Sequence, residues 1–149
     1  MMLDWLFSEP LAVGAAAPDF VLPDDAGRAV TLSGLRGKNV VLVFYPGDDT
    51  PGCTRQLCEL RDEWTAARER GVEVFGVNPQ SARSHAKFRG KYRLPFALLV
   101  DAGRKVAKLY RASGLIVKRT VYLIGPDGSI RFARRGMPAP AEVLGAIPQ

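Results

Sequence analysis

The chain contains few of the residues that build metal sites and disulfide frameworks. Its 149 residues include one histidine and two cysteines. Two cysteines are too few for a small secreted fold held together by disulfides, and a lone histidine, His85, cannot form a metal site by itself. The sequence therefore predicts no structural metal, no metal cofactor and no other bound cofactor.

Long apolar runs, internal repeats and low-complexity tracts are also missing from the sequence. The apolar start at residues 1–7 is short and is interrupted by Asp4, which fits a lipid-binding or packing segment but not a membrane-spanning helix. No basic stretch followed by an apolar run and a cleavage site is recognisable there. We therefore expect a cytoplasmic protein with no membrane partner.

The remaining composition fits a single globular domain. The chain is 47% hydrophobic, and a domain of this length buries about two-thirds of its unfolded surface on folding. No linker-like segment divides the sequence. We expect residues 1–149 to form one domain and the protein to be a monomer.

Positive charge is concentrated in the second half of the chain. Residues 1–82 hold 7 Lys and Arg against 12 Asp and Glu, whereas residues 83–149 hold 14 against 3. Such an imbalance is one signature of binding to nucleic acid or to another acidic partner. The basic residues in 83–93 and 131–135 are interleaved with helix and strand residues and lack aromatic stacking partners, which favours solvated faces and no nucleic-acid partner.

Strand and helix patterns alternate along the chain. Ser33 is expected to cap a brief turn that ends at Gly37. Strands separated by helices, with a late hairpin, imply a mixed β-sheet covered by helices on both faces. The expected elements are an N-terminal hairpin (20–22 and 29–31), strands at 40–44, 73–77, 97–100, 120–124 and 130–133, and helices at 52–70, 81–92, 105–110 and 139–147.

Both cysteines lie directly after the apolar strand pattern at 40–44. Cys53 falls at the start of the helix predicted from residue 52, where free backbone N–H groups and the helix dipole favour thiolate over thiol. A second thiol five positions later, Cys58, is placed to capture an oxidised Cys53. The alternative for Cys58 is a small buried core residue beside Leu57 and Leu60.

The segment around the cysteines resembles peroxiredoxins. Pro46, Thr50 and Cys53 match the family signature Pro-x-x-x-Thr-x-x-Cys, and Cys58 adds the second cysteine typical of the bacterioferritin-comigratory-protein, or Q-type, branch. Further similarity at 17–20, 94–96, 118–124 and 126–128 extends the resemblance from about residue 11 to residue 147. Together with the alternating pattern, it implies a thioredoxin-like fold.

The resemblance implies a peroxidase that reduces hydrogen peroxide or organic hydroperoxides without haem or metal. Cys53 would attack the peroxide and become a sulfenic acid, Cys58 would condense with it to an intramolecular disulfide, and a thioredoxin- or glutaredoxin-like donor would restore both thiols. The matching Arg119 would lie beside the attacking sulfur and hold the peroxide. Thr50 is expected to offer its hydroxyl, and Pro46 to shape the loop and exclude water.

A thiol–disulfide oxidoreductase of the same fold is the nearest alternative. Such enzymes generally carry Cys-x-x-Cys, whereas Cys53 and Cys58 are separated by four residues. In one regular helix, the two Cα atoms would lie about 8 to 9 Å apart, beyond the roughly 4.4 to 6.8 Å that a disulfide tolerates. We therefore expect the reduced form to be helical over residues 52–61 and the disulfide to require local unwinding. Two departures from the family pattern, Asn78-Pro79 and Met137-Pro138, stay unexplained by the sequence.

Overall fold

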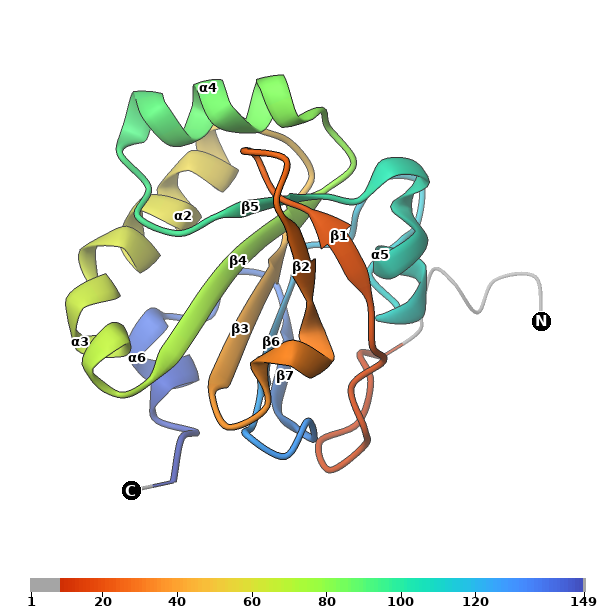
Figure 1. The fold of residues 1–149 in the computed structure, drawn as a ribbon, viewed down its shortest axis with the longest axis vertical. Coiled ribbons are helices and arrows are strands. Elements are labelled where there is room, and N and C mark those ends of the chain that lie inside the picture. The colour runs from red at the N-terminus through yellow and green to blue at the C-terminus, as the bar shows by residue number, and fades with distance from the viewer. Residues whose placement is uncertain (1–8, 149) are drawn as a thin grey trace.

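The structure of the chain is a computed structural model that describes residues 9–148 (Figure 1). The apolar segment predicted at residues 1–7 lies outside the described residues. The central sheet has five strands in the order β5-β4-β3-β6-β7, and β1 and β2 form a separate antiparallel pair. The strands are β1 (Val21–Pro23), β2 (Ala29–Thr31), β3 (Asn39–Phe44), β4 (Val72–Asn78), β5 (Leu98–Val100), β6 (Thr120–Ile124) and β7 (Ile130–Arg135).

The sheet is mixed, as the sequence predicted. Strand β4 runs parallel to β3 and to β5, whereas β6 is antiparallel to both β3 and β7. The helical elements are the 3₁₀ turns η1 (Leu32–Leu35) and η2 (Ala102–Arg104), and the helices α2 (Pro51–Asp62), α3 (Trp64–Glu69), α4 (Ala82–Tyr92), α5 (Lys105–Leu109) and α6 (Pro140–Leu144).

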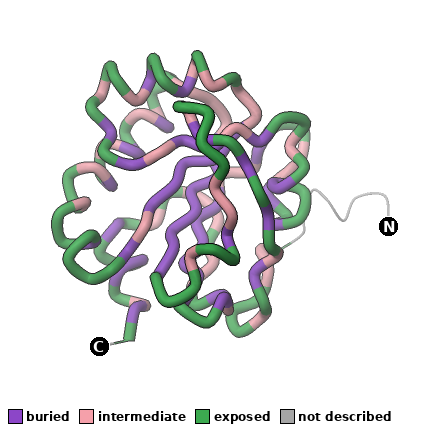
Figure 2. Tube along the Cα trace, viewed as in Figure 1, coloured by how far each residue is buried: buried purple, intermediate pink, exposed green. Residues whose placement is uncertain are grey.

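Strand β3 is buried along its whole length (Figure 2), and it separates two apolar clusters. Because successive side chains of a strand point to opposite faces, Leu42 and Phe44 pack on one side, whereas Val41 and Val43 pack on the other. The first cluster includes residues of the hairpin, η1 and α5, and the second includes residues of α2, α3, α4 and α6. Both faces of the sheet are therefore covered.

The helix predicted over residues 52–70 is two helices in the structure. Glu63 leaves the helical conformation (φ −94°, ψ 2°), and its N–H is shared between the carbonyls of Glu59 and Leu60. The break lets α3 turn so that Trp64 packs on Phe96, with ring centroids 6.1 Å apart.

Two smaller predictions also need correction. Ser33 does not cap η1, because the turn spans Leu32–Leu35 and Ser33 lies inside it; the cap position is Thr31, two residues earlier, and the Ser33 N–H donates to the Asp19 carboxylate. The last helix ends at Leu144 and not at Ile147, where the chain tightens into an i→i+3 turn before Pro148. The helix predicted over residues 81–92 is confirmed as α4, and Ser81 is its N-cap, where its side chain accepts from the Ser84 N–H.

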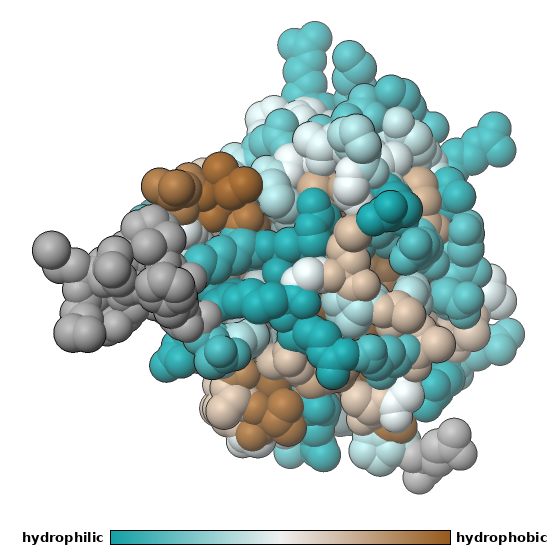
Figure 3. Space-filling model, turned by 180° about the vertical axis from the view of Figure 1, so that it is seen from behind, coloured by the Kyte–Doolittle hydropathy of each residue, from teal (hydrophilic) through white to brown (hydrophobic). Residues whose placement is uncertain are grey.

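The surface carries both polar and apolar regions. On the face opposite to that of Figure 1, hydrophilic side chains form a broad band between apolar patches (Figure 3). Within residues 9–148, no helix combines the length and the apolar character needed to cross a bilayer.

Candidate active site

Cys53 lies at the start of α2, as the sequence predicted. Pro51 takes the first helical position, where its missing N–H costs nothing, and Thr50 is the N-cap residue. The Cys53 side chain is fully buried beneath the helix, although it lies in the first turn. Backbone N–H groups of a first turn have no partner within the helix, so those of Gly52 and Cys53 are available to a negatively charged group.

Arg119 is brought to the Cys53 sulfur by the pairing of the sheet. It directly precedes β6, whose first residue, Thr120, pairs with Phe44 at the end of β3. This register places Arg119 at the edge of the sheet from which the chain enters α2. Its Nη2 donates to Cys53 Sγ over 3.2 Å. The structure thus brings together the cation and the thiol that the resemblance had paired.

Gln56 holds the other side of the Arg119 guanidinium, a contact that the sequence analysis did not assign. Its Oε1 accepts from Arg119 Nη1 over 2.7 Å, and its buried amide nitrogen donates to the Gly136 carbonyl. Arg119 also lies against Gly52, where a Cβ atom would come within 3.3 Å of Nη2. Both contacts fix the direction in which the guanidinium faces the sulfur.

The loop that leads into α2 comprises residues 46–50, and we call it the motif loop. Pro46 is its first residue and Thr50 its last. The Thr50 hydroxyl donates to the Gly47 carbonyl over 3.0 Å. Because a hydroxyl has two acceptor lone pairs, its oxygen can still accept a hydrogen bond from a bound ligand. Pro46 is half-buried directly after the buried Tyr45. The structure therefore places both residues in the loop without showing a direct contact of either with Cys53.

Cys58 is half-buried on the same helix, and both cysteines are free thiols. The predicted helix over residues 52–61 is confirmed, because α2 is continuous from Pro51 to Asp62. Its neighbours Leu57 and Leu60 are core residues, but Cys58 itself is partly open to solvent. In this helical form the two sulfurs cannot bond without a rearrangement of the backbone.

A buried polar network lies behind the motif loop, and the sequence analysis missed it. Asp48 accepts from Tyr45 and Ser84, and its Oδ2 lies 2.7 Å from Nδ1 of His85, which is fully buried between Asp48 and the Leu99 carbonyl. Burial raises the pKa of Asp48, but the hydrogen bonds from His85, Tyr45 and Ser84 outweigh it and lower the pKa below its ordinary value. Burial, and then the Asp48 charge, raise the pKa of Tyr45 well above its ordinary value.

No group of three or more His, Cys, Asp and Glu side chains within residues 9–148 is arranged to hold a metal ion. The site that the structure offers is therefore built from a thiol, a guanidinium, backbone N–H groups and a hydroxyl. Such a set can stabilise a thiolate and an oxygen that gains negative charge during a reaction.

The comparisons with known proteins agree on one family. The model of the AhpC/TSA family matches residues 13–133. Chloroplastic peroxiredoxin Q of Oryza sativa subsp. japonica is 40% identical over 136 residues, which cover 89% of this chain and 63% of the rice protein. Putative peroxiredoxin bcp of Coxiella burnetii is 41% identical over 132 residues, which cover 80% of this chain and 85% of the bacterial protein. The chain thus spans less than two thirds of the rice relative.

The solved structures give the same answer for the fold. The crystal structure of peroxidoxin BcpB from Mycobacterium tuberculosis superimposes with a TM-score of 0.83 at 33% sequence identity, covering 91% of this chain and 94% of that one. The thioredoxin-like fold with a mixed sheet and an N-terminal hairpin, predicted from the sequence, is confirmed.

Proposed function

Because the chain belongs to the AhpC/TSA family and resembles its peroxiredoxin Q and bcp members, we propose that it is a thiol peroxidase for hydrogen peroxide and organic hydroperoxides. One observation carries the proposal: Arg119 Nη2 lies 3.2 Å from the buried Cys53 sulfur at the start of a helix. A guanidinium and a helix N-terminus both stabilise the thiolate, which is the nucleophilic form of cysteine.

In the first step, the Cys53 thiolate attacks one peroxide oxygen. An S–O bond forms as the O–O bond breaks, so sulfur is oxidised to sulfenic acid and the peroxide is reduced to water or an alcohol after the leaving oxygen takes up a proton. Negative charge develops on that leaving oxygen. Arg119, the first-turn N–H groups and the Thr50 hydroxyl are the donors that we assign to it, and Pro46 shapes the loop and excludes water.

In the second step, the Cys58 thiolate attacks the sulfenic sulfur of Cys53 and displaces hydroxide, which leaves as water. The product is an intramolecular disulfide, and a thioredoxin- or glutaredoxin-like dithiol reduces it by exchange. The partial exposure of Cys58 supports this role, because a resolving thiol has to move and meet a reductant.

The two alternative functions are less well supported. Thiol–disulfide oxidoreductases generally carry two thiols three residues apart, which bond across one turn without unwinding the helix, whereas Cys53 and Cys58 lie five residues, or about 1.4 turns, apart in α2. For a nucleic-acid surface, several basic residues of the second half already pair with carboxylates. These pairs are Arg89–Asp25, Lys91–Asp49, Arg131–Asp127 and Arg134–Glu142.

We also propose that the chain works as one domain, as a monomer, in the cytoplasm. The single-domain proposal is supported by the two apolar clusters, which share the same five-stranded sheet. The monomer and the cytoplasmic location follow from the sequence pattern alone and stay predictions.

Peroxide consumption by two cysteine variants tests the proposed function. With thioredoxin as donor, Cys53→Ser is expected to abolish peroxide reduction. Cys58→Ser is expected to consume one equivalent of peroxide and then stop as a sulfenic acid, which a dimedone-type reagent traps. Each variant is the matched control of the other, because both lose one thiol from the same helix. Equal single-turnover bursts from the two variants would contradict the assignment.

A further inference from the structure

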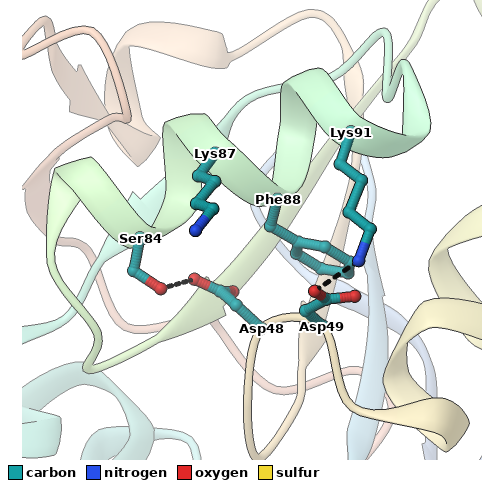
Figure 4. Close-up of a pocket in the computed structure, with 6 residues that line it drawn as sticks. All are labelled: Asp48, Asp49, Ser84, Lys87, Phe88 and Lys91. Carbon is teal, nitrogen blue, oxygen red and sulfur yellow. Dashed lines mark hydrogen bonds and ion pairs between the residues drawn. The ribbon is translucent and has the colours of Figure 1, made fainter.

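Two successive carboxylates attach the motif loop to helix α4 (Figure 4). Asp48 accepts from Ser84 and lies against His85, and Asp49 accepts from the Lys91 ammonium over 2.8 Å. A pocket of about 190 Å³ lies between the attachments, lined by both carboxylates and by residues of α4. Asp49 holds a left-handed backbone conformation (φ 57°), which is strained for a residue with a side chain. The loop is therefore held in one shape by its contacts.

The inner attachment contains a proton whose place can be deduced from the contacts. His85 Nε2 lies 2.9 Å from the Leu99 carbonyl, which can only accept, so Nε2 carries a hydrogen. His85 Nδ1 lies 2.7 Å from Asp48 Oδ2. A hydrogen bond at that position needs a proton on one of the two groups, because an imidazole lone pair and a carboxylate repel each other.

The other neighbours of Asp48 show on which group the proton belongs. Tyr45 Oη lies 2.6 Å and Asn78 Nδ2 3.2 Å from Oδ1, and Ser84 Oγ lies 2.7 Å from Oδ2. The Ser84 oxygen accepts from Gln80 Nε2, which leaves its hydrogen free for Asp48. A carboxylate surrounded by donors is stabilised in its ionised form. The proton therefore belongs on the His85 ring, as an imidazolium.

The network connects the motif loop to four elements of the fold. Tyr45 follows β3, Asn78 ends β4, and His85 reaches from α4 to Leu99 in β5. The backbone N–H of Asp48 donates to Gln80 Oε1, and Gln80 is fixed in turn by Asn78 Oδ1. Asn78, which the sequence alone left unexplained, donates to Asp48 in this network.

We propose that Asp48 and His85 form a buried ion pair that positions the motif loop, and with it Thr50 and Cys53, for the peroxide step. The proposal rests on the proposed peroxidase function. Asp48 lies midway between Pro46 and Thr50 in the sequence, so a shift of its carboxylate moves the loop that presents the Thr50 hydroxyl and starts α2. Both members of the pair are positioning residues, because neither touches Cys53.

The first test reads the proton directly. His85 is the only histidine of the chain, so protein labelled with ¹⁵N-histidine gives one pair of imidazole signals. At pH 7 the wild-type ring is expected to show protons on both nitrogens. In Asp48→Asn, the new amide donates to Nδ1, and a neutral ring protonated only on Nε2 is expected. A neutral ring in the wild type would overturn the ion pair.

The second test measures the peroxide step in a single turnover. Asp48→Asn keeps the size of the side chain, and we expect its second-order rate constant with hydrogen peroxide to fall about 10- to 100-fold, as displaced reacting groups do. Ser84→Ala removes one donor from Asp48, and its rate constant is expected to fall less, about two- to fivefold. This milder variant keeps the test valid if Asp48→Asn does not fold.

Asp101→Asn is the matched control. Asp101 is also a buried carboxylate, but its oxygens accept from the Val106 and Ala107 N–H groups of α5; only its backbone N–H reaches the network, donating to the Asn78 carbonyl, and Asp101→Asn keeps that bond. We expect this variant to lose stability and keep the wild-type peroxide rate. An unchanged rate in both Asp48→Asn and Ser84→Ala would overturn the positioning role. Failure of the wild type to consume peroxide would instead overturn the proposed function, and the imidazole signals would still report on the pair.

Discussion

The motif loop and helix α2 adjoin each other around Cys53, but they are held in place by different forces. Hydrogen bonds to Asp48 and an ion pair at Asp49 fix the loop. Helix α2 is held mainly by the buried side chains of Leu57 and Leu60, with polar contacts from Gln56 and Arg61. Hydrogen bonds are directional, whereas apolar burial is not. The loop is thus held to one shape by contacts with other elements, whereas the shape of α2 depends on hydrogen bonds within its own backbone, which local unwinding can break and re-form.

This difference fits the two steps of the proposed cycle. The peroxide step needs donors that are already in position when the O–O bond breaks. The loop and Arg119 carry such donors, and their contacts hold them in place. The disulfide step needs Cys53 and Cys58 to approach by several ångströms, which only the helix can provide. The boundary between the fixed and the moving part then lies close to Thr50, where α2 begins.

The largest expected effect comes from removing the fixed cation. Arg119→Ala is expected to slow the peroxide step at least about 100-fold, because it removes one donor to the oxygen that develops negative charge. Arg119→Lys should recover only part of the rate, because an ammonium does not replace a guanidinium that contacts both Cys53 and Gln56.

Stopped-flow oxidation measures this rate. Arg134→Ala is the control, since Arg134 is a half-exposed cation of β7 that pairs with Glu142. It should keep the wild-type rate. If Arg119→Ala kept the wild-type peroxide rate, Arg119 would have no part in the peroxide step.

The sequence predicted the parts of this site that depend on short-range patterns. Cys53 at a helix start, the hairpin and the helical spacing around Cys58 follow from local turn residues and apolar periodicity. Arg119 lies 66 residues from Cys53, and the resemblance alone indicated that they meet. Its position in the structure depends on the pairing of β3 with β6.

The parts that the sequence did not predict depend on tertiary contacts. His85 lies 37 residues from Asp48, and a single histidine in a helix pattern looks the same whether it is solvated or buried. The break at Glu63 was missed because glutamate is a good helix former, and the turn is set by Trp64 packing on Phe96.

A smaller effect is expected from oxidation of the wild-type protein. Formation of the disulfide should lower the hydrogen-exchange protection of amides 53–61 by at least about tenfold, because local unfolding exposes them. Amides of the motif loop and of β3, β4 and β6 should keep their protection. Mass spectrometry of the two redox forms measures this pattern, with Cys58→Ser treated with the same oxidant as control.

Two results of that experiment would break the comparison between loop and helix. Equal protection of amides 53–61 in both redox forms would mean that the disulfide forms without unwinding α2. Equal loss of protection in the helix and in the motif loop would mean that the contacts of Asp48 and Asp49 do not stop the rearrangement at Thr50.

The smallest expected effect is the dependence of stability on acid pH. The pKa of Asp48 lies below its ordinary value of 3.8 in the folded protein, so the unfolded chain takes up a proton at a higher pH than the folded one. The stability that the carboxylate contributes is therefore fully present above the ordinary value, and it is lost as the pH falls through the lowered one. The groups that face it are Tyr45, Asn78, Ser84 and His85, and Lys87 lines the adjoining pocket.

Urea unfolding of the wild type and of Tyr45→Phe between pH 2 and pH 7 measures this contribution. Tyr45→Phe removes one donor to Asp48 and keeps the carboxylate opposite His85, so the histidine contributes equally to both proteins. The difference in free energy of unfolding should be constant above about pH 5 and should shrink below about pH 3.8. A difference that already shrinks between about pH 7 and pH 5 would mean that Asp48 takes up its proton there in the folded protein. The proton would then belong on Asp48, His85 would be neutral, and the loop would be held by neutral hydrogen bonds instead of an ion pair.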